Sequence, residues 1–384
     1  MTMLDETITL LGELVACPTV SSDSNLACIA ALAERLEDAG ARVEVMSDES
    51  GDKANLYATI GPDVEGGILL SGHSDVVPTE GQDWTADPFT LTPRDGRLYG
   101  RGTCDMKGFI AACVAMAPQL AAQVKSRPLH FAFTYDEEVG CLGAKSLAEQ
   151  LKTREVLPSV AIIGEPTSMR VVEGHKGCCE YTTRFRGRSG HGSDPGAGVN
   201  AVEYAARYIA RLMELREALK ARTPPESRFE PPWTTINTGA LVGGFAHNVI
   251  PAEAEVQWEM RPVADVDASF VRGELESYIN EILLPEMQAV APEAAITTET
   301  IGDTPGLLPM TEGEAAALAC ALTGSNGGAL VPFNTEAGVF QQLGIDVVIC
   351  GPGSVEQAHK PDEFLEVSQL SQCLAMLERL GTRL

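Results

Sequence analysis

The chain has 384 residues, of which 44% are hydrophobic, and its formal net charge is −26 from 28 basic and 54 acidic side chains. It is long enough to bury a substantial core and to form two domains. The strong acidity argues against nucleic acid and against anionic membrane surfaces as partners, because both would repel it. It favours a cationic substrate only weakly, since surface acidity commonly serves solubility.

The cellular compartment is indicated by hydropathy and by cysteine usage. No apolar run approaches the roughly 20 residues that cross a bilayer, and the stretch MTMLDETITLLGELVA is acidic and amphipathic rather than a basic leader. The 10 cysteines are scattered through apolar contexts without a CxxC pair. Because this pattern is typical of buried, reduced thiols, we expect a cytoplasmic protein.

The first part of the chain alternates helices and strands. Apolar residues recur at helical spacing over residues 4–16, 25–39, about 106–120 and about 144–151. The apolar runs that predict strands are ARVEVM (41–46), NLYATIG (55–61), GGILLSG (66–72), LHFAFTY (129–135) and SVAIIG (159–164). This pattern predicts an α/β fold, with a mostly parallel mixed sheet covered by helices on both faces and a ligand site at the carboxyl ends of its strands.

From about residue 177 the order of elements changes to β-α-β-β-α-β. Helical spacing covers 199–222 and about 270–283, and the predicted strands are EYTTRFRG (180–187), TTINTGALV (234–242), EAEVQWEMR (253–261) and AAITTET (294–300). The order predicts a ferredoxin-like α+β domain over residues 177–300. This domain would be inserted into a discontinuous first domain formed by residues 1–176 and 301–384.

The first pattern resumes after the insertion. Thr311 and Glu314 fit a capping box at the start of a helix, DVVICG (346–351) predicts a buried strand, and apolar residues from Val367 to Leu377 predict a closing amphipathic helix.

Acids and histidines gather at the strand ends of the first domain. They are His73, Asp75, Glu137, Glu138 and Glu165, each just after a predicted buried strand, together with Asp105 in GRGTCDMKG and His359 in EQAHKPDE. Strand ends of such a sheet converge on one crevice, where several carboxylates cannot all stay ionised unless a cation compensates them. Carboxylate and imidazole ligands favour zinc, with cobalt and manganese as alternatives, whereas structural zinc would favour thiolates.

The spacing of His73 and Asp75 has a physical reason. Residues i and i+2 of an extended segment point to the same side, so Asp75 can accept a hydrogen bond from the imidazole nitrogen that does not bind metal. Each of these residues taken singly has an ordinary explanation as a surface or core side chain. The hypothesis of a metal site depends on their convergence in one crevice.

The segments GHSDVVP, GRGTCDMKG, DEEVGCLGA, GEPT and AHKPDE together resemble the metal motifs of the M20 family of dinuclear metallohydrolases. The similarity spans nearly the whole chain, including the inserted domain. It implies two metal ions bridged by Asp105, one held also by His73 and Glu165 and the other by Glu138 and His359.

The resemblance also implies the reaction class, which is amide hydrolysis, and makes Glu137 the general base and acid. Successive strand residues point to opposite sides, so Glu138 can ligate a metal while its neighbour Glu137 reaches the reacting water. The peptide after the bridging aspartate is often cis in this family, so we expect a cis Asp105–Met106 bond.

Three residues of the inserted domain match family positions. His191 in SGHGSDPGAGVNA would reach the partner subunit's active site and stabilise the oxyanion, which implies a homodimer and makes the inserted domain a lid and dimerisation domain. Asn248 and Arg261 would hold a substrate carboxylate, a task that suits a guanidinium group. From the residues alone, His191 as a loop cap and Arg261 as a surface charge are the alternatives.

Within the family, GEPTSMRVVEGHKG, NTEAGVFQQLGIDVVICGPG and EQAHKPDEF resemble the acetylornithine deacetylase branch. The succinyl-diaminopimelate desuccinylases usually carry a serine- and glycine-rich stretch where this chain has FNTEAG. The resemblance implies release of acetate and L-ornithine from N2-acetyl-L-ornithine in arginine biosynthesis. Glu336 would either pair with the distal amine of that substrate or brace its loop.

Other functions are weighed against this one. Another N-acyl-amino-acid deacylase or a dipeptidase would use the same metal site on a different small molecule. A catalytically silent relative that binds a small molecule would not need Glu137. A serine or cysteine hydrolase is disfavoured, because the chain has no G-x-S-x-G elbow and no credible Cys–His pair.

Overall fold

The structure is a computed structural model that describes residues 1–310 and 312–384. The chain divides into two compact units. One is formed by Met1–Gly174, Pro309–Val331 and Thr335–Leu384, and the other by His175–Leu308 with Pro332–Asn334. The first unit is discontinuous in sequence, and most of the second lies between its first two segments.

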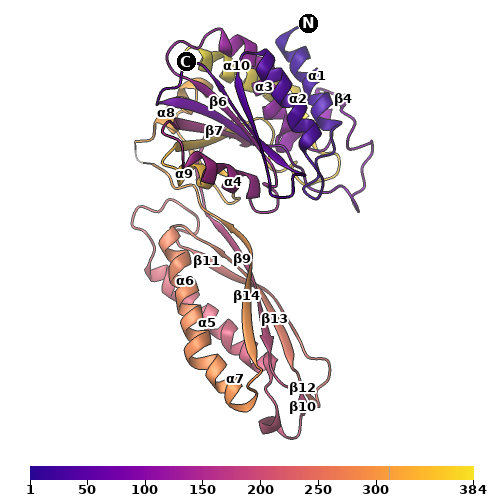
Figure 1. Ribbon diagram of the computed structural model, residues 1–384, viewed down its shortest axis with the longest axis vertical. Coiled ribbons are helices and arrows are strands. Elements are labelled where there is room, and N and C mark those ends of the chain that lie inside the picture. Colours follow the sequence, from indigo (N-terminus) through magenta and orange to yellow (C-terminus); the bar gives the residue numbers. More distant parts are fainter. Residues whose placement is uncertain (311) are drawn as a thin grey trace. The chain divides into compact units, whose positions relative to one another are not determined.

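An eight-stranded mixed sheet forms the centre of the first unit (Figure 1). In spatial order its strands are β1 (Arg42–Ser47), β2 (Ala54–Ile60), β6 (Leu129–Thr134), β3 (Gly67–His73), β7 (Pro158–Pro166), β16 (Asp346–Gly351), β8 (Val172–His175) and β15 (Ala329–Val331). The adjacent strands β6, β3, β7 and β16 are parallel, whereas β1, β2 and β8 pair antiparallel. Every residue of β2, β3 and β6 is buried, which explains their continuous apolar sequences.

Helices cover both faces of this sheet, which confirms the predicted fold class. They are α1 (Met3–Val15), α2 (Leu26–Asp38), α3 (Gly108–Ala121), α4 (Leu142–Leu151), α8 (Glu314–Thr323), α9 (Ala337–Gln341) and α10 (Val367–Gly381). Helix α3 packs against α1, α2 and α10, and Figure 1 shows α4 and α9 on the opposite side of the sheet. Since it is enclosed by these neighbours, α3 is apolar around almost its whole circumference.

Some features of this unit differ from the sequence-based expectation. A small sheet of β4 (Thr92–Arg94), β5 (Arg97–Tyr99) and β17 (Phe364–Glu366) was not predicted, because strands of three residues are too short to show a period. Thr311 of the predicted capping box lies outside the described residues, and α8 begins after Gly313.

The inserted unit has the predicted β-α-β-β-α-β order. Its elements are β9 (Cys178–Arg186), β10 (Gly190–His191), a 3₁₀ turn (Pro195–Ala197), α5 (Ala201–Ala221), β11 (Thr235–Gly243), β12 (Val249–Ile250), β13 (Glu253–Arg261), α6 (Asp265–Tyr278), a π turn (Ile279–Leu283), α7 (Leu284–Val290) and β14 (Ala295–Thr304). The antiparallel sheet has the order β11-β13-β9-β14, and β10 pairs with β12. The predicted boundary at residue 300 falls inside β14, because this strand pairs with β9 as far as Thr304.

Among the described residues, no helix is both long enough and apolar enough to cross a membrane.

His130 on β6 gives the first unit a defined response to acid. The buried ring stacks on Tyr57, and its Nδ1 lies 3.0 Å from Tyr57 Oη and 2.9 Å from Thr59 Oγ1. Burial lowers the pKa of this imidazole from 6.5 to about 4. As the pH falls below about 6.5 the unfolded chain takes up the proton first, so the stabilisation present above that pH is lost progressively down to about pH 4.

We expect the free energy of unfolding to fall by about 1.4 kcal/mol per pH unit from His130 alone within this window. Urea unfolding at pH 7, 5.5 and 4.5 measures the total slope, and His130→Gln removes this contribution while keeping a polar side chain. The variant should therefore lose less stability than the wild type on acidification. Equal losses in the two proteins would contradict the assignment.

Candidate metal centre

The predicted metal ligands lie at one edge of the first unit's sheet because the strands before them are adjacent and parallel. His73 is the last residue of β3, Glu165 is the penultimate residue of β7, and Glu138 follows the end of β6 by four residues. Strand β3 pairs in parallel with both β6 and β7. Their carboxyl ends therefore meet, as the topology of the fold requires.

Asp105 is brought to the same edge by a distorted turn at the start of α3. Within the π-helical turn Thr103–Lys107, Asp105 and Met106 leave the helical conformation, and the peptide between them is cis, as expected. The turn packs closely on β3, where a Cβ at Gly72 would lie 2.6 Å from Met106 Cε. The glycine in SGH therefore permits Asp105 to approach His73.

The five side chains form two groups that share Asp105. In one, His73 Nε2 lies 3.0 Å from Asp105 Oδ1 and 4.0 Å from Glu165 Oε1. In the other, His359 Nε2 lies 3.0 Å from Glu138 Oε2 and 3.4 Å from Asp105 Oδ2. Within each group the potential ligand atoms all lie within 4.8 Å of one another. Asp105 thus directs one oxygen to each group, an arrangement that suits a bridging ligand.

The pKa values of the histidines reflect the surrounding negative charge. Burial opposes protonation of His73, but the nearby carboxylates of Asp105 and Asp75 outweigh it and raise the pKa of the imidazole well above its usual value. Hydrogen bonds to Asp105 and Glu138 raise the pKa of His359 to about 10. The carboxylates around both imidazoles therefore favour a positive charge at these positions. A bound cation would supply that charge in place of the protons.

The donor set fits divalent metal ions. Asp105, Glu137, Glu138 and Glu165 are four acids around two imidazoles, so their full ionisation would leave negative charge in excess even with both histidines protonated. Burial raises the pKa of Glu165, and its Oε1 is buried without a hydrogen-bond partner. An unpaired, desolvated carboxylate oxygen is costly, and coordination to a cation would relieve that cost. Carboxylate oxygen with imidazole nitrogen is a ligand set typical of zinc, cobalt and manganese.

Glu137 is set apart from its neighbour by its environment. Burial raises the pKa of its carboxyl group to about 8, and the adjacent Glu138 and Asp105 charges act in the same direction. The Cys141 thiol donates to Glu137 Oε1 at 3.4 Å. A carboxyl group that exchanges its proton near neutral pH is suited to general acid and base catalysis.

Asp75 differs from the prediction in how it contacts His73. The Nδ1 of His73 lies 3.0 Å from the backbone carbonyl oxygen of Asp75, while the carboxylate oxygen Oδ1 is 3.6 Å away. The Asp75 carboxylate instead accepts the backbone N–H groups of Glu137 at 3.0 Å and Glu138 at 3.3 Å, and the hydroxyl of Ser21 at 2.7 Å. Asp75 therefore links the His73 segment to the turn that carries both glutamates.

A second support of that turn was not predicted from the sequence. Asp136 has a positive φ of 52° and both its carboxylate oxygens lie 2.6 Å from Lys53 Nζ. A lysine between two strands carries no local signal of such a role, because its partner is 83 residues away in the chain.

Glu336 lies in a different environment from the metal ligands. It is fully buried, and burial raises the pKa of its carboxyl group. The hydroxyl of Ser71 donates to Oε1 at 2.6 Å and that of Thr134 donates to Oε2 at 2.7 Å. Both oxygens are thus engaged by the ends of β3 and β6. These contacts favour the alternative in which Glu336 braces its own loop over the one in which it pairs with a substrate amine.

His191 and Asn248 lie side by side in the inserted unit. Strands β10 and β12 pair there, and the N–H of Gly192 donates to the carbonyl oxygen of Asn248 at 2.8 Å. The exposed His191 ring has its Nδ1 2.7 Å from Ser193 Oγ. This leaves Nε2 of the ring available for another partner.

Arg261 is the last residue of β13 in the four-stranded sheet of the inserted unit, whereas His191 and Asn248 lie at the separate β10–β12 pair. Its guanidinium donates to Glu259 Oε2 at 2.7 and 3.0 Å and to Asn334 Oδ1 at 3.3 Å. Strand β13 runs from the Asn248 end to Arg261. At about 3.4 Å per residue, the two ends are separated by a distance on the order of 25 Å. One small molecule therefore cannot contact Arg261 and Asn248 of the same chain.

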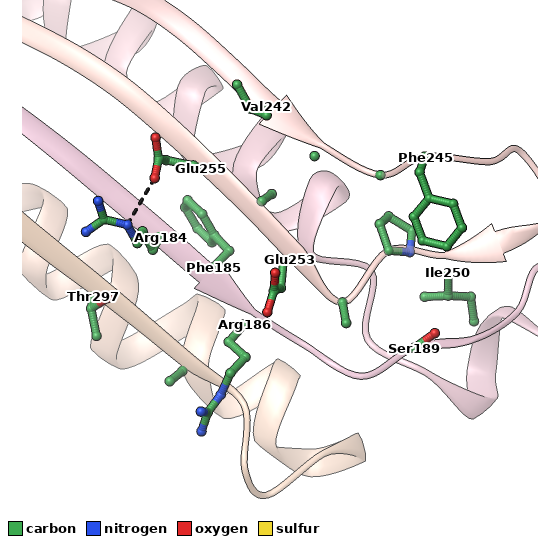
Figure 2. A pocket seen from close by; sticks show the side chains of 16 residues that line it. Arg184, Phe185, Arg186, Ser189, Val242, Phe245, Ile250, Glu253, Glu255 and Thr297 are labelled. Carbon is green, nitrogen blue, oxygen red and sulfur yellow. Dashed lines mark hydrogen bonds and ion pairs between the residues drawn. The ribbon is translucent and has the colours of Figure 1, made fainter.

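A hollow of about 1010 Å³ lies on the inserted sheet (Figure 2). The Arg184–Glu255 ion pair, at 3.0 Å, lies within it, and Phe245 and Ile250 line another part. None of the candidate metal-binding groups among residues 1–310 and 312–384 includes a residue that lines this hollow. Val242 and Phe245, which are 61% and 86% exposed, make this region an apolar surface beside an open strand edge.

Comparison with known proteins gives one family. The chain matches the model of peptidase family M20/M25/M40 over residues 69–383. A protein of Pasteurella multocida named acetylornithine deacetylase is 37% identical over 375 residues, which cover 96% of this chain and 95% of the relative. A protein of the same name from Erwinia tasmaniensis is 38% identical over 374 residues, which cover 96% and 94%.

Solved structures share the fold at low identity. An M20 family metallo-carboxypeptidase from Sulfolobus solfataricus has a TM-score of 0.75 and 18% identity, with coverage of 98% of this chain and 99% of that chain. The YXEP protein of Bacillus subtilis, described as a dinuclear metal binding peptidase, has a TM-score of 0.64 and 16% identity, with coverage of 99% and 98%.

The contacts of Asp75 predict a graded response to mutation. Asp75→Asn replaces an oxygen that accepts N–H groups with a donor, so the turn carrying Glu138 should shift and zinc affinity should fall about 10- to 100-fold. Ser21→Ala removes one hydroxyl contact and should cost only about 1 kcal/mol of stability. Chelator competition and thermal unfolding measure the two effects.

Asp63→Asn is the matched control, because the Asp63 side chain is 84% exposed and its ion pair, with Arg42 at 3.3 Å, is on the surface. It should leave zinc affinity unchanged. A zinc affinity of Asp75→Asn equal to that of this control would show that Asp75 does not organise the centre.

Proposed function

This chain belongs to peptidase family M20/M25/M40, and we propose that it removes the acetyl group from N2-acetyl-L-ornithine to give L-ornithine and acetate. One observation carries the proposal: proteins named acetylornithine deacetylase are 37% and 38% identical to it over nearly their whole length. Membership in the family agrees with the resemblance of the motifs. The chain is accordingly a metal-dependent hydrolase, and the choice of substrate is the proposed step.

The residues of the first unit would carry the chemistry. His73, Asp105 and Glu165 would hold one zinc ion, and Asp105, Glu138 and His359 a second. When bound, such ions polarise the amide carbonyl and make water easier to deprotonate. Glu137 would take the proton from the attacking water and return it to the nitrogen of the departing amine. Cobalt and manganese are alternatives to zinc, because they accept the same ligands.

A homodimer would complete the site. His191 and Asn248 lie on the order of 25 Å from Arg261 in one chain, so these groups could act on one substrate only if they came from two chains. Arg261 would hold the substrate carboxylate, while His191 of the partner subunit would stabilise the oxyanion. The open edge of β11 and the exposed Val242 and Phe245 support association through the inserted unit.

The thiols support a reducing compartment. None of the ten cysteines, all of which lie in the part of the chain that the structure describes, forms a disulfide, and most are buried. This usage is typical of cytoplasmic enzymes, where thiols are kept reduced.

The first test is the release of free α-amine from N2-acetyl-L-ornithine by zinc- or cobalt-loaded protein. N-acetyl-methionine, N-succinyl-diaminopimelate and a dipeptide serve as competing substrates, each with and without a chelator. We expect turnover that the chelator abolishes and that is highest on N2-acetyl-L-ornithine. Chelator-sensitive turnover highest on another compound would overturn the substrate and leave the metal mechanism in place.

Glu137→Gln separates metal binding from catalysis. The variant should keep its bound metal and lose at least about 100-fold in kcat, because proton transfer is removed while the ligands are untouched. Glu149→Gln, at an exposed helical position paired with Lys152, is the matched control and should keep full activity. Full activity in Glu137→Gln would exclude this residue as the base.

Subunit mixing tests whether active sites are shared. Glu137→Gln and His191→Ala should each be inactive as homodimers, whereas a mixed dimer has one intact site in which Glu137 meets the partner subunit's His191. Random mixing should therefore restore about one quarter of wild-type activity. Mixing Glu137→Gln with Asp105→Asn should restore no activity. Each change disables the site of the chain that carries it, so a mixed dimer has no intact site. No recovery in the first mixture would contradict the shared site.

A further inference from the structure

The loop that carries His359 also carries a buried carboxylate that does not belong to the metal groups. Glu363 is fully buried, and four donors converge on it. Oε2 accepts from Arg101 Nη1 at 2.8 Å and from the N–H of Gly102 at 2.9 Å. Oε1 accepts the N–H groups of Cys104 at 2.8 Å and Asp105 at 3.1 Å. Three of the four donors are thus backbone groups in or next to the turn that presents Asp105.

Arg101 connects the same carboxylate to the other side of the centre. It is 1% exposed, and its Nη1 also donates to the carbonyl oxygen of Lys360 at 3.4 Å. Its Nη2 donates to Gln82 Oε1 at 2.6 Å, and Gln82 Nε2 donates to the carbonyl oxygen of His359 at 2.9 Å. Side chains that do not contact the metal groups therefore hold the backbone at both Asp105 and His359.

Both ligands need such support. Asp105 lies in a turn that departs from helical geometry, so the regular hydrogen bonds of a helix do not fix it. His359 has a positive φ of 62°, a conformation that costs energy for a residue other than glycine, and its side chain is 55% exposed. Packing does not fix the ring of His359, so the position of its backbone decides where the ring nitrogen lies.

We propose that Glu363, acting with Arg101 and Gln82, is a positioning residue that sets the separation between Asp105 and His359 and thereby the metal affinity of the Asp105–Glu138–His359 group. This inference rests on the metal centre of the proposed function and is independent of the substrate. A carboxylate needed only to neutralise Arg101 would not have to accept three backbone N–H groups. Hydrogen bonds from N–H groups to a charged oxygen are short and directional, so they can fix a turn.

The experiment titrates Glu363→Gln with zinc and with cobalt, using calorimetry and metal analysis after graded chelator. Glutamine keeps the volume but replaces one acceptor oxygen with a donor that faces N–H groups. We expect wild type to bind two ions, and Glu363→Gln to bind one with nearly unchanged affinity and the second about 10- to 100-fold more weakly. Its visible spectrum with one cobalt ion should match that of His359→Ala with one cobalt ion.

Two further variants separate positioning from general stability. Glu366→Gln changes a half-buried glutamate three residues along the chain, paired with Arg97 at 3.6 Å, and should bind two ions as wild type does. Gln82→Met cuts the link between Arg101 and His359 without leaving a buried charge, and should weaken the same ion. If Glu363→Gln does not fold, Gln82→Met is the variant that tests the positioning role.

Each outcome separates this inference from the proposed function. Unchanged affinity for both ions in folded Glu363→Gln, or in Gln82→Met where the first variant does not fold, would overturn the positioning role. Wild type that does not bind two ions would overturn the metal centre and this inference together. Wild type that binds two ions but does not hydrolyse N2-acetyl-L-ornithine would overturn only the proposed substrate. The difference in metal affinity between the variants would still decide the role of Glu363.

Discussion

The excess of negative charge at one edge of a parallel sheet is the constraint on which the structure depends. Asp105, Glu137, Glu138 and Glu165 lie together with two imidazoles, and Glu165 Oε1 is buried without a partner. Like charges at this density destabilise the fold unless cations or protons compensate them. The sheet provides the opposing stability, since β2, β3 and β6 are entirely buried and anchor the loops that carry the acids.

Two carboxylates outside the metal groups organise these loops in the same way. Asp75 accepts the N–H groups of Glu137 and Glu138. Glu363 accepts the N–H groups of Gly102, Cys104 and Asp105. Each of them fixes the backbone of a segment that carries a ligand, rather than the ligand's side chain. The oxygens of the candidate metal ligands are thereby left available for ions, while Asp75 and Glu363 hold the backbone of the segments that carry them. An additional pair of negative charges near the centre is the cost of this arrangement.

The sequence predicted the strands and the metal ligands because both leave local signals. The runs before His73, Glu137 and Glu165 are apolar and continuous, and their ends must meet in a parallel sheet. Contacts between distant segments leave no such signal. Nothing in the sequence connects Glu363 to Arg101 or Lys53 to Asp136, and the acceptor for His73 turned out to be a backbone carbonyl of Asp75, which any residue would provide. Glu336 was recognised as notable, but only its contacts with Ser71 and Thr134 distinguish a brace from a substrate contact.

In the proposed function, the first unit would carry the reaction and the insertion would contribute to recognition of the substrate. All the predicted ligands and the candidate base lie in the first unit, whereas His191, Asn248 and Arg261 belong to the insertion. A change in the insertion can therefore alter the substrate without disturbing the charge balance that holds the metal centre together. Because β13 keeps Arg261 apart from Asn248, such a change in one chain would also act on the site of another in a dimer. In the proposed dimer, selection for a new substrate would then act on the interface between subunits as well as on the metal centre.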